Sequence, residues 1–164
     1  MPLLKNGKIA EDQWTFVEDG QEPAGAQVIV SFARFQAEHA SLLSGNHQIG
    51  VRLANTDDPE ALAPWLDQIQ LVELQFPKYT DGRALSQAQL LRRRYGYRGE
   101  IRATGQVLRD QLRLMIRSGF DAIVIDQADA EAVYAYSSHE LSEFYQSAAD
   151  GAVSIFEKRH RAKP

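Results

Sequence analysis

Short apolar runs alternate with longer amphipathic segments along most of the chain. Five runs are rich in valine, isoleucine and leucine and have the length of buried strands; they span residues 28–30, 49–53, 69–76, 100–103 and 122–125. Strands that alternate with helices over short connections indicate parallel βαβ units with right-handed crossovers. The pattern therefore predicts an α/β fold with about five mostly parallel strands in repeated βα units.

Local signals set the ends of the helices between these strands. Helices are expected at residues 35–43, 61–66, from 86 onward, and 106–117. The first helix is expected to end at residues 44–46, where glycine or asparagine can take the left-handed backbone conformation. Asp58 before Pro59 is typical of a cap and a first helical position, and Ser86 begins a capping-box pattern. Gly119 is expected to stop the helix at 106–117.

The two ends of the chain differ from this core. Residues 1–25 mix polar groups with Trp14 and Phe16 and predict a short strand or hairpin at the domain edge. After Asp126, short helices are expected at 130–136 and 141–149, the second opened by a Ser137-x-x-Glu140 capping box. The tail at 157–164 is charged and is expected to fray.

We therefore expect one domain over residues 1–164, with an edge segment at 1–25, a βα core at 26–126 and a helical C-terminal segment at 127–164. A complete eight-stranded barrel usually needs about 250 residues. An open wound sheet and a half-barrel-like arrangement both remain possible.

Composition narrows the class of protein. The chain is 44% hydrophobic and 24% charged, as is usual for a globular domain. It contains no cysteine, which excludes disulfides, thiolate catalysis and cysteine-ligated clusters or zinc. No apolar run approaches the length of a signal peptide or a membrane span. We expect a cytoplasmic protein with no membrane partner.

The net charge of −4 is unevenly distributed. Between Lys78 and Arg117 there are ten basic residues and three acids, a charge of +7, whereas the remainder holds eight basic and nineteen acidic residues, a charge of −11. Positive potential is thus concentrated where an anionic partner could approach. Six arginines lie on or beyond predicted helix bodies and are expected to be solvated or to face a partner, namely Arg92, Arg93, Arg94, Arg98, Arg113 and Arg117.

Ligands of parallel α/β sheets bind outside the carboxyl ends of the strands, so the residues that follow each strand are the candidates. The ligand-binding candidates are Lys78, Thr80, Arg83, Arg102, Arg109 and Gln111. The candidates for acid or base chemistry are Lys78, Asp81 and Asp110.

The helix predicted at 106–117 places Gln111 inside its apolar face. A buried amide needs partners, so Gln111 either bonds neighbouring backbone or reaches a ligand. Arg109 and Asp110 lie near the start of that helix, where they either bind an anion or join a surface ion network.

Other motifs are absent or weak. No dinucleotide, P-loop, nucleophile-elbow or zinc-protease motif occurs. The four histidines lack metal-ligand spacing, so no metal is expected. The run Arg92-Arg93-Arg94 lacks interleaved aromatic residues and the chain is acidic, so no nucleic-acid partner is expected. The pattern identifies no cofactor; a flavin bound by an unrecognised loop stays open.

Three linked motifs resemble a known family. They are Phe76-Pro77-Lys78-Tyr79-Thr80-Asp81-Gly82-Arg83, then Leu91-Arg92 through Gly96-Tyr97-Arg98-Gly99-Glu100-Ile101-Arg102-Ala103-Thr104-Gly105, then Val107-Leu108-Arg109-Asp110-Gln111-Leu112 with Gly119-Phe120-Asp121-Ala122. In this order they resemble the bacterial family catalogued as domain of unknown function 934. Its members are often encoded beside the sirohaem-dependent sulfite reductase, and some are labelled oxidoreductases.

The resemblance implies sulfite reduction as the pathway and carries over no proven catalytic residue. Many relatives have cysteine where this chain has Ser118, which argues against an obligatory thiol there.

Three hypotheses follow. The first is an accessory protein of assimilatory sulfite reduction that binds a small anionic ligand or docks on sulfite reductase through its basic edge. The second is a small enzyme with acid or base chemistry on an anionic substrate. The third is a structural subunit of a homo-oligomer.

Overall fold

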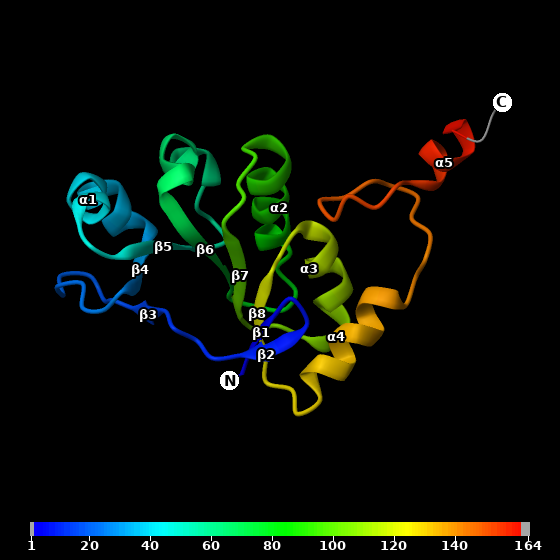
Figure 1. Cartoon of the computed structure of the whole chain (residues 1–164), viewed down its shortest axis with the longest axis horizontal. Coiled ribbons are helices and arrows are strands. Elements are labelled where there is room, and N and C mark those ends of the chain that lie inside the picture. Colours follow the sequence, from blue (N-terminus) through cyan, green and yellow to red (C-terminus); the bar gives the residue numbers. More distant parts are fainter. Residues whose placement is uncertain (1, 162–164) are drawn as a thin grey trace.

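One eight-stranded sheet forms the centre of the computed structural model, which describes residues 2–161 (Figure 1). Its strand order is β2-β1-β8-β7-β6-β5-β4-β3. Strands β3 to β8 are parallel to their neighbours, whereas β1 pairs antiparallel with both β8 and β2. The strands are β1 Leu3–Lys5, β2 Lys8–Ala10, β3 Thr15–Phe16, β4 Gln27–Ser31, β5 Gln48–Leu53, β6 Ile69–Phe76, β7 Glu100–Gly105 and β8 Ala122–Val124.

The helices that connect β4 through β8 cover one face of this sheet. Because consecutive strands are parallel neighbours, right-handed crossovers place every connecting helix on the same side, and the sheet curls into a half barrel. Figure 1 shows α1, α2 and α3 along this convex side, with the N-terminal strands β2 and β3 away from it. The helical elements are α1 Phe32–Ser44, the 3-10 helix η1 Pro59–Gln68, α2 Arg83–Gln89, the π-helical turn η2 Leu90–Arg94, the 3-10 turn η3 Arg109–Gln111, α3 Leu112–Ser118, α4 Ala130–His139 and α5 Ile155–Arg161.

The two faces of the sheet carry different residues because side chains alternate along each strand. On the helix-covered face, a row of branched aliphatic residues crosses four strands in register and is completely buried; it consists of Val30, Val51, Val72 and Ile101. One position further along each strand, the concave face carries a polar row, made of Ser31, Arg52, Glu73 and Arg102. The core thus lies between sheet and helices, and charged side chains lie on the opposite face.

The five strands predicted from the sequence correspond to β4 through β8, and the half-barrel arrangement is the one that forms. The predicted strand number was wrong, because the sheet has eight strands of mixed orientation. The three additional strands are only two or three residues long and all lie within the first 25 residues. β1 and β2 form the expected hairpin, which extends the sheet beyond β8.

Several helix ends differ from the prediction. Asp58 caps its helix as expected, with its side chain accepting from the backbone N–H of Glu60 at 2.9 Å, but η1 is a 3-10 helix. The predicted start at Ser86 was wrong because α2 begins at Arg83. Gly45 ends α1 with an extended backbone and not a left-handed one. Gly119 stops α3 in the left-handed conformation, as predicted.

The C-terminal segment is less helical than expected. Because α4 continues through Ser137 to His139, the predicted capping box opens no helix, and residues 141–149 form none. Helix α5 occupies 155–161 and so includes 157–161, where a frayed tail was predicted. The end of that predicted tail, 162–164, lies outside the described residues. Figure 1 shows the segment after α4 running back past α3 before it reaches α5.

Candidate functional site

The loop after β6 places Lys78, Thr80, Asp81 and Arg83 at the carboxyl edge of the sheet. Lys78 and Thr80 are exposed. Asp81 is engaged by its neighbours: Arg83 donates to it from Nε at 3.0 Å and from Nη2 at 2.7 Å, and Asn55 donates from the β5 loop at 2.6 Å. Arg83 is therefore neutralised within its own loop.

These contacts change the acidity of Asp81. The hydrogen bonds from Arg83, aided by its charge and by Asn55, lower the pKa of Asp81 from 3.8 to about 2. A carboxylate with so low a pKa is a weak base near neutral pH. The geometry thus suits Asp81 to joining the β5 and β6 loops better than to transferring protons.

Gln111 connects the β6 loop to the turn that precedes α3. Its side-chain amide donates to the backbone carbonyl of Tyr79 at 2.6 Å and accepts from the backbone N–H of Leu108 at 3.2 Å. Of the two alternatives for this residue, bonding to neighbouring backbone is the one observed. It lies in η3, because α3 begins only at Leu112, and it is half-buried. The loops that carry Lys78 and Arg109 are consequently held side by side.

Arg109 and Asp110 lie at a cavity between the start of α3 and the end of α4. The cavity measures about 450 Å³ and is lined by Arg109, Asp110, Arg113, Tyr136, Ser137 and Glu140. Arg113 pairs with Glu140 at 3.2 Å. Arg109 forms no ion pair with any of residues 2–161. The cavity therefore combines one paired and one unpaired guanidinium with two carboxylates and two hydroxyl groups.

A smaller cavity lies at the carboxyl ends of β5, β6 and β7. It measures about 150 Å³ and is lined by Ala54, Asn55, Gln75, Phe76, Pro77 and Gly105. The backbone of Gly105 has a φ of +96°, and a Cβ atom there would lie 2.4 Å from the carbonyl oxygen of Phe76. Only glycine fits at this position without a shift of the backbone.

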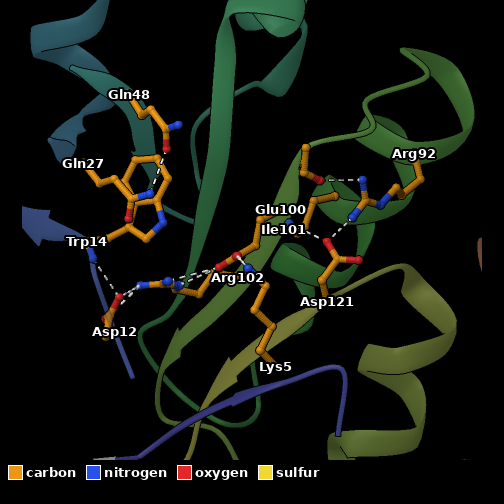
Figure 2. Close-up of polar contacts among 11 residues, drawn as sticks. Lys5, Asp12, Trp14, Gln27, Gln48, Arg92, Glu100, Ile101, Arg102 and Asp121 are labelled. Carbon is orange, nitrogen blue, oxygen red and sulfur yellow. Dashed lines mark hydrogen bonds and ion pairs between the residues drawn. The ribbon is translucent and has the colours of Figure 1, made fainter. Parts of the chain in front are cut away.

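The position expected for Arg102 was wrong. Strand β7 continues to Gly105, so Arg102 lies in mid-strand on the concave face and is 2% exposed (Figure 2). Its Nε and Nη2 donate to Glu100 at 3.1 and 3.0 Å, and its Nη1 donates to both oxygens of Asp12. Lys5 also pairs with Glu100, at 2.7 Å. Because buried charges need partners, these contacts account for Arg102 without a ligand.

The remaining polar row of the concave face was not singled out from the sequence. Arg52 forms a close ion pair with Glu73, and its guanidinium lies 3.6 Å from the centre of the Phe16 ring. Thr104 donates to the same oxygen of Glu73 at 3.3 Å. A signal was present in the sequence, because Arg52 and Glu73 each interrupt an otherwise largely apolar strand. They lie toward the carboxyl half of the sheet, where ligands of barrel-type folds bind.

Arg92 was expected to be solvated or to face a partner, and that expectation was wrong. It donates to the backbone carbonyls of Gly119, Tyr97 and Gly99 at 2.8 to 3.0 Å. It also pairs with Asp121 (Figure 2). Asp121 in turn accepts from the backbone N–H of Ile101 at 2.8 Å. Several motif residues are thereby explained as one structural centre that joins η2, β7 and the approach to β8.

The described residues contain neither a cluster of metal-ligating side chains nor a helix able to span a membrane. Within the described part of the chain, acidic residues and histidines do not gather in groups of three or more that could hold a metal ion. Of the helices formed by residues 2–161, none is long and apolar enough to cross a membrane.

The chain belongs to the family described as a bacterial protein of unknown function, DUF934, whose model matches residues 50–156. This match confirms the resemblance inferred from the motifs. It covers β5 through α4, including the β6 loop, Gln111 and the cavity beside Arg109. A comparison with curated proteins found no match.

Proposed function

We propose, on the premise of this family membership, that the chain is a cytoplasmic accessory protein of assimilatory sulfite reduction that binds a small oxyanion at the carboxyl edge of its sheet. The observation that carries the proposal is the exposed Arg109, which lines a cavity of about 450 Å³ and forms no ion pair with residues 2–161. The gene context of the family, known from the resemblance, supports the pathway.

The lining of the cavity suits a particular kind of anion. Arg109 and Arg113 supply planar guanidinium groups, which bind oxyanions with two parallel hydrogen bonds. Asp110 and Glu140 bring acceptors to the same lining, so a ligand that carries a proton as well as a negative charge fits best. Hydrogensulfite and hydrogenphosphate both meet this description.

Lys78 provides a second cation nearby. It lies on the loop that the hydrogen bond from Gln111 to Tyr79 holds against the turn carrying Arg109. Among residues 2–161 it also has no ion-pair partner. A point charge on this loop would attract an oxyanion toward the cavity without fixing its orientation.

Calorimetric titration of the purified protein with sulfite, sulfate and phosphate tests the binding. We expect sulfite to bind and Arg109→Ala to weaken it by about tenfold or more. Arg98→Ala is the matched control, because Arg98 is also exposed and unpaired among the described residues but lies before β7, outside this cavity. Equal affinity of the wild-type protein and Arg109→Ala would show that the cavity is not the site.

Growth on sulfate as the only sulfur source tests the pathway. We expect a deletion strain to grow poorly on sulfate and normally on cysteine, and the wild-type gene to restore growth where the Arg109→Ala gene does not. Normal growth of the deletion strain on sulfate would contradict the role in sulfite reduction and leave the binding result unaffected.

A further inference from the structure

Two arginines at the end of η2 lie on the surface without an ion-pair partner among residues 2–161. Arg93 and Arg94 are exposed, and neither forms an ion pair with residues 2–161. Their neighbour Arg92 is fully engaged with backbone carbonyls and Asp121. The three consecutive arginines therefore divide into one structural residue and two that point their charge outward.

Two cavities share Arg93 in their linings and therefore adjoin at this side chain. One measures about 380 Å³ and lies along α2 and η2, lined by Ser86, Gln89, Leu90, Arg93 and Arg94. The other measures about 520 Å³ and is lined by Arg93, Tyr145, Gln146, Ser147, Ser154 and Phe156. We call the two together the Arg93 groove.

The second half of the groove presents exposed aromatic side chains. Tyr145 is 82% exposed and Phe156 is 64% exposed. The segment that carries them is held to the body, because Arg117 stacks on Phe144 at 3.7 Å and pairs with Asp150 at 3.1 Å. Aromatic residues that a fixed backbone holds in water are typical of protein interaction sites.

The charges around the groove favour an acidic occupant. Each acid of the neighbouring segment is engaged within the chain: Glu143 with Lys158, Asp150 with Arg117, and Glu157 with the backbone N–H of Ser154. Helix α5, which carries Phe156, also ends in basic residues. The positive charge of Arg93 and Arg94 is thus not neutralised by the acids beside it.

We propose that the Arg93 groove docks an acidic segment of a partner protein, with an apolar side chain of that segment packed against Tyr145 and Phe156. The arginines would pair with its carboxylates, and the aromatic residues would supply the buried anchor that gives such contacts most of their affinity. The net charge of −4, and a groove lining that includes only two exposed aromatic residues among those described, favour a protein over a nucleic acid. The groove shares no lining residue with the cavity beside Arg109, so failure of one proposal would not contradict the other.

Photo-crosslinking in the native host tests the groove. A photoreactive amino acid replaces Tyr145 in the full chain, and mass spectrometry identifies the crosslinked peptide. We expect a peptide from another protein that is rich in Asp and Glu and contains an apolar residue. The double charge reversal Arg93→Glu/Arg94→Glu should reduce the crosslink about tenfold or more, whereas Arg98→Glu should leave it unchanged.

Thermal melting of each variant separates loss of docking from loss of folding, and Phe156→Ser supplies a second variant that preserves the charges. Four outcomes would overturn the proposal: no crosslink, a crosslink to nucleic acid or lipid, a crosslink to a second copy of this chain, or a peptide whose yield the charge reversal does not change. Anion binding measured on the same variants should be unaffected, whichever outcome is found.

Discussion

Asp12 accepts two hydrogen bonds from Nη1 of Arg102, at 3.0 and 2.9 Å, across ninety positions of sequence. The same carboxylate accepts from the backbone N–H of Trp14 (Figure 2). The Trp14 ring lies over Gly50 on the concave face. This relationship fixes the N-terminal segment against the middle of the sheet. Asp12 also supplies part of the negative charge that the Arg102 guanidinium needs, because that group is only 2% exposed.

Replacing Asp12 should therefore destabilise the fold. We expect Asp12→Ala to lower the free energy of unfolding by about 1 to 3 kcal/mol, because Arg102 keeps Glu100 but loses its other charged acceptor. Denaturant unfolding measures the difference. Glu11→Ala, at the exposed neighbouring position, should stay within about 0.5 kcal/mol of wild type. Equal stability of the two variants would mean that the contact contributes little.

A lysine should not replace Arg92. Arg92 donates to three backbone carbonyls and pairs with Asp121 through a planar guanidinium, a geometry that an ammonium group does not reproduce. We expect Arg92→Lys to cost at least about 2 kcal/mol in denaturant unfolding, since some of these groups lose their donor. Arg93→Lys is the matched control and should be neutral. A neutral Arg92→Lys would refute the structural role.

Alanine substitutions at two glycines with similar backbone angles distinguish the cost of backbone strain from the cost of a steric clash. Gly105 and Gly20 have φ values of +96° and +85°, but a Cβ at Gly105 would meet the carbonyl of Phe76, whereas a Cβ at Gly20 would meet nothing within 4 Å. Gly20→Ala should cost about 1 kcal/mol from the left-handed backbone alone. Gly105→Ala should cost at least about 1 kcal/mol more. Similar melting temperatures for the two variants would contradict the close approach.

The acidity of Asp81 can be followed directly. Its pKa is lowered from 3.8 to about 2, chiefly by hydrogen bonds from Arg83. A lowered pKa in the folded state contributes stability that is complete above about pH 3.8 and is lost as the pH falls toward 2. We expect carboxyl carbon NMR to give a midpoint near 2 in the wild-type protein and a clearly higher midpoint in Arg83→Gln. Coincident midpoints would show that Arg83 is not the cause.

The amino-acid sequence by itself determined the local structure of the core. Apolar runs of strand length and the signals at Asp58 and Gly119 lie within a few residues of the features they produce, so β4 through β8 and two helix ends could be predicted. The predicted strand ends also located the loops from which the candidate ligand-binding residues were taken. Very short strands such as β3 lack an apolar run of strand length, which explains why the strand number was too low.

Only the tertiary structure decided which charges are neutralised. Four arginines look alike in sequence but differ in the fold: Arg83 pairs within its own loop, whereas Arg92 and Arg102 are held in networks with distant partners. Of these four, only Arg109 has no ion-pair partner among residues 2–161. The reason is physical: the alternation of residues gives the face of a strand, but strand register and chain crossings determine what lies opposite. Asp12 reaches Arg102 only because the N-terminal segment crosses the concave face.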